Sequence, residues 1–189
     1  PSPLPPSPGA LPSERPLAPE RENGYDMGET AGGGDAVTAE DYMRRALELA
    51  RKSLETEDVP VGCVIADREG RIVGEGWNRR EADGDALAHA ECVAIRDACA
   101  RRGGWNLHGC RLYVTLEPCA MCAGAILNAR IERVYYGARE EKTGACGSVC
   151  NLFMEGFPHK PRLYGGILAG ECAALLGRFF RDLRDLTQI

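Results

Sequence analysis

The sequence lacks any apolar run that approaches the roughly 20 residues needed to cross a bilayer. It also lacks a basic and apolar leader of the kind that directs a chain to secretion. Its nine cysteines are an odd number, which is not typical of a secreted disulfide framework. We therefore expect a cytoplasmic protein with no membrane partner, whose thiols stay reduced.

The sequence also has no excess of positive charge, since its net charge is −5. Residues 1–40 account for all of it with seven acidic and two basic side chains, whereas residues 41–189 carry 21 of each. A neutral domain lacks the strongly basic balance of a general nucleic-acid binder, and we expect no DNA partner. Such a domain can still bind a polyanion through one local patch.

Residues 1–36 contain eight of the twelve prolines and almost no large apolar side chain. Such a segment cannot bury enough apolar surface to offset the entropic cost of ordering, so we predict a disordered tail at 1–36. Residues 37–189 are long enough for one domain with a hydrophobic core. Helical and strand patterns alternate along them, which predicts an α/β fold whose sheet is covered by helices.

The element predictions rest on periodicity and on residues that begin or end helices. Thr38 is a helix cap in front of apolar residues at helical spacing, namely Met43, Leu47, Ala50 and Leu54. Residues 59–77 alternate as a β-hairpin with its turn at 67–70. Further strands are expected at 110–116 and 131–138, and further helices at 86–101, 118–129 and 171–186. The buried face of the last helix is expected to hold Phe179, Phe180 and Leu183.

The segment TLEPCAMCAGA at 115–125 places two cysteines three positions apart behind Pro118. Proline suits the first position of a helix, so Cys119 and Cys122 are predicted in or near the first turn, on one face. Unpaired backbone N–H groups there favour the thiolate form. Taken alone, the pair fits a metal site, a redox dithiol or two small core residues.

His-Ala-Glu at 89–91 lies about 30 residues upstream, at the predicted start of another helix. Together His89, Cys119 and Cys122 would supply three protein ligands, which leave tetrahedral zinc one position for water. Glu91 would then take and return the proton of that water. A closed structural zinc would need a fourth protein ligand, and the sequence has no second paired motif to supply one.

These two motifs resemble the zinc-dependent cytidine and nucleotide deaminase superfamily. Together with GEGWNR, KTGACGS and ECAALLGRFFR, they are most similar to its bacterial tRNA adenosine deaminases, over residues 40–181. The resemblance implies a three-layer α/β/α fold with a mixed five-stranded sheet flanked by helices. It also implies one zinc ion per subunit held by His89, Cys119 and Cys122, with Glu91 as the catalytic proton shuttle and Asn78 as a substrate-binding residue.

The reaction implied by the resemblance is hydrolytic deamination of adenosine to inosine at the wobble position of a tRNA anticodon stem-loop. The implied assembly is a homodimer. One alternative is a free-base or nucleotide deaminase that acts on guanine, cytosine or deoxycytidylate, which would share the same motifs. Two others are a non-catalytic, zinc-stabilised RNA-binding module and a dithiol redox protein.

Several residues outside the motifs have simpler interpretations. Glu140 departs from much of the family, which has aspartate at this place. In the last helix an arginine stands at every third residue and could face phosphate: Arg178, Arg181 and Arg184. Asp182 and Asp185 lie four positions after Arg178 and Arg181, however, so ordinary surface pairing is the default expectation. Trp77 and Trp105 could stack on bases, yet packing in the fold is the default expectation.

Overall fold

The computed structural model of the protein describes residues 37–187. The predicted disordered tail at 1–36 lies outside the described residues and stays a prediction. The strands are β1 (Gly62–Ala66), β2 (Ile72–Trp77), β3 (Arg111–Leu116), β4 (Arg133–Ala138) and β5 (Arg162–Gly165). The α-helices are α1 (Ala39–Lys52), α2 (Arg80–Asp83), α3 (Ala90–Arg102), α4 (Ala120–Asn128) and α5 (Ala169–Thr187). Two short 3₁₀ helices are η1 (Ser53–Thr56) and η2 (Leu152–Met154).

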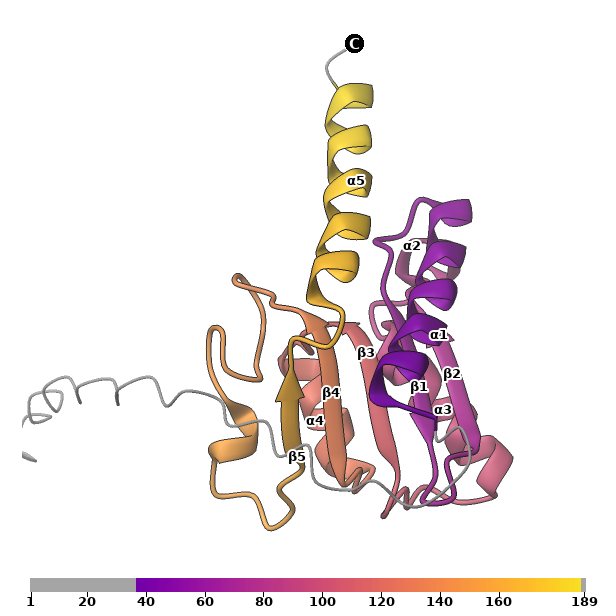
Figure 1. Ribbon diagram of the computed structural model, residues 1–189, viewed down its shortest axis with the longest axis vertical. Helices are drawn as coiled ribbons and strands as arrows, with labels where there is room; N and C mark the ends of the chain where they lie inside the picture. Colours follow the sequence, from indigo (N-terminus) through magenta and orange to yellow (C-terminus); the bar gives the residue numbers. More distant parts are fainter. Residues whose placement is uncertain (1–36, 188–189) are drawn as a thin grey trace, which may run out of the picture. The chain divides into compact units, whose positions relative to one another are not determined.

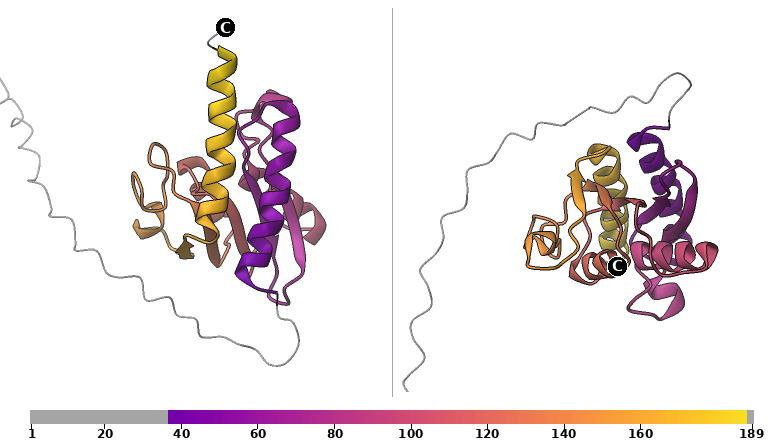
Figure 2. Two further views of the ribbon diagram at one scale, coloured as in Figure 1. Left: turned by 45° about the horizontal axis from the view of Figure 1, so that its top comes forward. Right: turned by 90° about the horizontal axis from the view of Figure 1, so that it is seen from below.

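The five strands form one mixed sheet in the order β2-β1-β3-β4-β5. Strand β1 is antiparallel to β2 and β3, whereas β3, β4 and β5 run parallel. Helices α1 and α5 cover one face of this sheet, and α3 and α4 cover the other (Figures 1 and 2). The predicted three-layer α/β/α fold with a five-stranded sheet is therefore confirmed.

Helix α1 begins as predicted at Thr38, whose side chain accepts from the Asp41 backbone N–H while the Asp41 carboxylate accepts from the Thr38 N–H. This reciprocal pairing satisfies donors that the helix itself leaves unpaired. Met43, Leu47 and Ala50 are buried as expected. Leu54 was expected on the same stripe but lies beyond the end of α1, in η1, and is 43% exposed.

Contact between β2 and α3 depends on small residues. A Cβ atom at Gly76 would stand 2.4 Å from the Ala90 carbonyl oxygen, and one at Gly74 would stand 2.5 Å from the Ala94 carbonyl oxygen. Backbone therefore packs almost directly on backbone here. This close approach brings the start of α3 against the sheet, next to His89.

The prediction for the last helix is wrong at its apolar face, since Phe180 is 42% and Leu183 is 48% exposed. Helix α5 is long enough to extend beyond the end of the sheet (Figure 1). Its first turns bury Cys172 and Leu175 against the sheet, while later turns lie past it. The apolar residues of α5 therefore continue at helical spacing beyond the point where the sheet can bury them.

Three other expectations differ from the structure. Strand β5 was not predicted, because its four residues are too few to show alternation. Pro118 precedes the helix rather than opening it, since Cys119 is the cap of α4. Trp105 is 63% exposed in the loop after α3 and does not pack in the core.

Within residues 37–187, no helix is long and apolar enough to span a bilayer.

Candidate zinc and substrate site

Two helix starts bring the predicted metal donors together at one end of the sheet. His89 is the cap of α3 and has extended dihedrals (φ −70°, ψ 151°), as its position beside Glu91 requires. Cys119 is the cap of α4, and Cys122 lies in that helix's first turn. Strand β3 runs directly toward Cys119, so the sheet holds this end of α4 in place.

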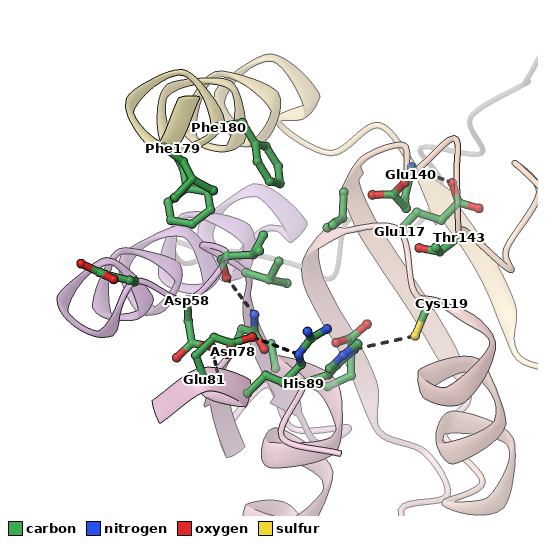
Figure 3. A pocket seen from close by; sticks show the side chains of 18 residues that line it. Asp58, Asn78, Glu81, His89, Glu117, Cys119, Glu140, Thr143, Phe179 and Phe180 are labelled. Atoms are coloured by element: carbon green, nitrogen blue, oxygen red, sulfur yellow. Dashed lines mark hydrogen bonds and ion pairs between the residues drawn. The ribbon is translucent and has the colours of Figure 1, made fainter. Parts of the chain in front are cut away.

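The separations of the donor atoms match a tetrahedral zinc site. His89 Nδ1 lies 3.7 Å from Cys119 Sγ and 3.6 Å from Cys122 Sγ (Figure 3 shows His89 and Cys119). With Zn–S near 2.3 Å and Zn–N near 2.0 Å, tetrahedral geometry places N and S donors about 3.5 Å apart. Within residues 37–187 the group of donors contains these three side chains alone. Cys92 Sγ is 4.0 Å from Cys122 Sγ but is not one of the group.

The thiol and carboxyl groups at the site have shifted pKa values. A hydrogen bond from Cys122 and a second from the His89 ring lower the pKa of Cys119 to about 4. A thiolate is the form that binds metal, so Cys119 is prepared for it. The hydrogen bonds of Cys122 with Cys119 and Cys92 raise the pKa of the Cys122 thiol well above its usual range. Burial raises the pKa of Glu91 to about 7, because this side chain sits in the wall of the pocket and is only 4% exposed.

A cavity of about 460 Å³ opens beside the donors and is lined by His89, Glu91 and Cys119 together with Asn78. The Asn78 amide nitrogen donates to the Val59 carbonyl at 3.1 Å. Its Oδ1 is buried and has no hydrogen-bond partner. A buried acceptor without a partner costs free energy, so this oxygen is available to a hydrogen-bond donor that enters the cavity.

Sequence reasoning missed Glu117, which organises the loop on one side of the pocket. Its carboxylate accepts from the backbone N–H groups of Glu140, Cys146 and Ser148, and from the Ser148 hydroxyl. These partners follow Glu117 by 23 to 31 residues, so no local pattern reveals them. Glu140 lies next to Glu117, with Thr143 beside them (Figure 3).

The opposite side of the pocket is formed by Phe179, Phe180 and Leu183 of α5 (Figure 3 labels the two phenylalanines). The side chains predicted for a helix core therefore border the pocket. The predicted pairing of Arg178 with Asp182 and of Arg181 with Asp185 is also wrong, because neither arginine forms an ion pair within residues 37–187. Arg184 forms none in that range either. All three are exposed.

The site and the fold together define a zinc-binding deaminase. The family model described as "Cytidine and deoxycytidylate deaminase zinc-binding region" matches residues 36–138. The chain therefore belongs to the zinc-dependent cytidine and deoxycytidylate deaminase family. Zinc is accordingly the cofactor, and the three donors are positioned to bind a metal ion.

Individual proteins of known sequence or structure show which deaminases the chain is most like among those compared. The tRNA-specific adenosine deaminase of Bacillus subtilis is 43% identical over 144 residues, which cover 76% of this chain and 89% of that protein. A solved structure from work on A-to-I editing by tRNA:A34 deaminases at the wobble position is 43% identical, with a TM-score of 0.69. The aligned region covers 71% of this chain and 97% of the chain in that structure. A guanine deaminase from Nitrosomonas europaea shares the fold at 24% identity and a TM-score of 0.66, over 76% of this chain and 85% of its own.

Proposed function

We propose that the protein hydrolyses adenosine to inosine and ammonia at the wobble position of a tRNA anticodon stem-loop. The observation that carries the proposal is one pocket, lined by two of the three zinc donors, His89 and Cys119, and by the buried carboxyl group of Glu91. The unpaired buried amide oxygen in the same pocket belongs to Asn78. The choice of tRNA is supported by 43% identity to a tRNA-specific adenosine deaminase along most of both chains.

Each residue has a separate role in the proposed reaction. Zinc held by His89, Cys119 and Cys122 supplies a Lewis acid that makes water a better nucleophile. The Glu91 carboxylate accepts a proton from the attacking water. It passes this proton to the ring nitrogen next to the reacting carbon. It would then take the second proton from the hydroxyl group now on that carbon and give it to the amino group, which leaves as ammonia. A pKa near 7 suits a group that must both accept and donate.

Asn78 is proposed to orient the base. One N–H of its Nδ2 donates to the Val59 carbonyl, and the buried Oδ1, which has no partner, can accept a hydrogen bond from an N–H group in the pocket. This contact would fix the purine relative to Glu91. A base that is already unpaired in a loop reaches such a pocket without the cost of opening a duplex.

The rim of the pocket favours an RNA loop over a free base. The pocket extends from the zinc donors to Phe180 and Leu183, which are large, apolar and exposed. A free base bound next to the zinc donors would leave this rim in water. A nucleotide within a loop presents neighbouring bases that can cover it, as aromatic side chains commonly bind unstacked bases.

The test compares wild type with Glu91→Gln on an anticodon stem-loop that carries adenosine at the wobble position. Inosine should form with wild type, while the variant should keep stoichiometric zinc and lose at least 100-fold in rate, at the low end of what a general acid–base contributes. Guanine, cytosine and deoxycytidylate are assayed in parallel. Turnover of a free base without inosine in the stem-loop would establish the alternative deaminase, and an active Glu91→Gln variant would exclude the assigned role.

Two further features of the family resemblance stay proposals. We propose a homodimer, which is what the family resemblance implies. Sedimentation of the purified protein tests it. We also propose a cytoplasmic location, which the nine free thiols support because a reducing compartment preserves them.

A further inference from the structure

A row of arginines crosses three strands at the end of the sheet away from the zinc donors. Arg111 of β3 is in register with Arg133 of β4, and Arg133 is in register with Arg162 of β5. Paired residues on parallel strands point to the same face, so the three guanidinium groups are neighbours. Arg68 joins them in a polar cavity of about 200 Å³, which Arg111 and Arg133 also line.

This row carries positive charge that the chain does not neutralise. Within residues 37–187, Glu132 is the one carboxylate that forms an ion pair with any of the four arginines, at 3.7 Å from Arg68 and 3.8 Å from Arg133. Arg111 donates to the backbone carbonyl of Arg68 at 3.4 Å and also hydrogen-bonds the Tyr113 side chain, and neither partner is a carboxylate. Like charges placed directly opposite on neighbouring strands are destabilising. An anion bound from outside the chain would therefore stabilise this arrangement of arginines.

The neighbouring side chains on the same face are tyrosines. Tyr113, Tyr135 and Tyr164 are in register two positions after the arginines, and their rings stack at centroid distances of 4.7 Å. Tyr113 is buried beneath Tyr42 of α1, whereas Tyr135 and Tyr164 are partly exposed. In Figure 1, α1 lies beside β4 and β5 rather than over them. The face is thus accessible on its β5 side.

We propose that this arginine row, Arg111, Arg133 and Arg162 with Arg68, binds the phosphodiester backbone of the RNA substrate at a distance from the reacting base. The inference rests on the proposed function. With strands about 4.8 Å apart, the row spans about 10 Å, which matches two to three successive phosphates better than a single anion. Four arginines against one carboxylate leave an excess of three positive charges for such a strand.

The distance from the zinc site specifies which part of the RNA reaches the row. The six residues of β3 separate the two places by roughly 20 Å. A loop nucleotide in the pocket cannot itself contact the row, so we place the contact on the body of the tRNA, beyond the short anticodon stem-loop. The expected effect is therefore on affinity for a whole tRNA, with the chemical step unchanged.

The experiment measures equilibrium binding of full-length tRNA and of a short anticodon stem-loop, as a function of salt. The test variant carries Arg111→Gln, Arg133→Gln and Arg162→Gln. We expect its tRNA affinity to fall at least tenfold, and the slope of log affinity against log salt to become shallower by about 2 to 3. Binding of the short stem-loop and its kcat should change less than twofold.

Two matched variants control for folding and for net charge. The triple lysine variant at the same positions keeps the charge and should restore most of the affinity. A variant with Arg44→Gln, Arg51→Gln and Arg101→Gln removes the same charge from the exposed faces of α1 and α3 and should bind tRNA as wild type does. Circular dichroism and zinc content are compared for all three.

Each other outcome overturns the proposal. Equal tRNA binding by wild type and the glutamine variant would show that the row does not contact RNA. Loss of inorganic phosphate binding with tRNA binding unchanged would assign a small-anion site, and a shift from dimer to monomer with tRNA binding unchanged would assign an interface between copies. Because binding is measured without turnover, absence of inosine with wild type would disprove the proposed function separately.

Discussion

Asn78 is a side chain whose amide is only half used by the folded chain. Its Nδ2 pairs with Val59, and its buried Oδ1 has no partner. We expect Asn78→Ala to lower kcat/KM about 10- to 100-fold, because one hydrogen bond to the base, worth about 1–3 kcal/mol, is lost. Zinc content should not change. Asn128→Ala, at an exposed position on α4, is the control, and equal kcat/KM in both variants would exclude a contact with substrate.

Glu117 acts through its neighbours, because its carboxylate holds the backbone of the loop that carries Glu140 and Thr143 to the pocket. In Glu117→Gln one acceptor oxygen becomes an NH₂ donor that faces N–H donors. We expect KM to rise about tenfold while kcat stays within twofold, since about 1.4 kcal/mol of loop positioning is lost.

Glu155→Gln, at an exposed position, is the control for Glu117→Gln. Steady-state kinetics and zinc content are measured on both variants. Loss of zinc from Glu117→Gln with KM unchanged would mean that the carboxylate supports Cys119 and not the loop.

At the scale of elements, the fit between β2 and α3 decides where His89 stands. Gly76 faces the Ala90 carbonyl, one residue from the metal donor. Gly76→Ala should therefore displace the start of α3, lower the free energy of unfolding by about 1–3 kcal/mol and weaken zinc binding. Denaturant titration and competition with a chelator measure the two effects.

The matched control is Gly124→Ala, because a Cβ atom there meets nothing within 4 Å and the position lies inside α4. This change should raise the stability by up to about 1 kcal/mol, as alanine is the better helix former. If both variants bind zinc equally well, the close approach of β2 and α3 is not what positions His89.

Helix α5 shows how one element serves two environments. Its first turns are anchored by Cys172, which lies against Gly137 so closely that a Cβ atom there would stand 2.3 Å from the sulfur. Its later turns carry Phe179 and Phe180 to the pocket. Periodicity in the sequence predicts the apolar stripe but does not distinguish a stripe that meets a core from one that borders a ligand cavity.

At the scale of the whole molecule, the metal ties together α3 and α4, which follow different strands. A ligand that binds only the folded state stabilises it, by about 2.7 kcal/mol when free zinc is 100 times its dissociation constant. Chelation should therefore lower the midpoint of thermal unfolding by about 5 to 10 °C in a domain of this size.

Added zinc should restore the midpoint in wild type. Cys122→Ser should show little response to either chelator or zinc, because one of the three donors is replaced by a poorer one. Differential scanning calorimetry measures both proteins. An unchanged midpoint in chelated wild type would mean that zinc contributes nothing to the stability of the fold.

Several features could be predicted from local patterns because their physics is local. The cap at Thr38, the hairpin of β1 and β2, and the helix start at His89 each depend on neighbours within a few residues. The spacing of Cys119 and Cys122 likewise follows from one turn of helix. The chemistry of these donor types was then enough to indicate zinc and a water-activating carboxyl group.

Contacts between distant segments required the folded chain. The partners of Glu117, the unpaired oxygen of Asn78, the exposure of Phe180 and the arginine row across β3, β4 and β5 all depend on strand order and register. Neither the order of the strands nor their register can be predicted from a short stretch of sequence. Local spacing therefore identifies the chemistry of this protein, whereas packing over long separations determines the shape and rim of its pocket, because those contacts form only when remote strands pair.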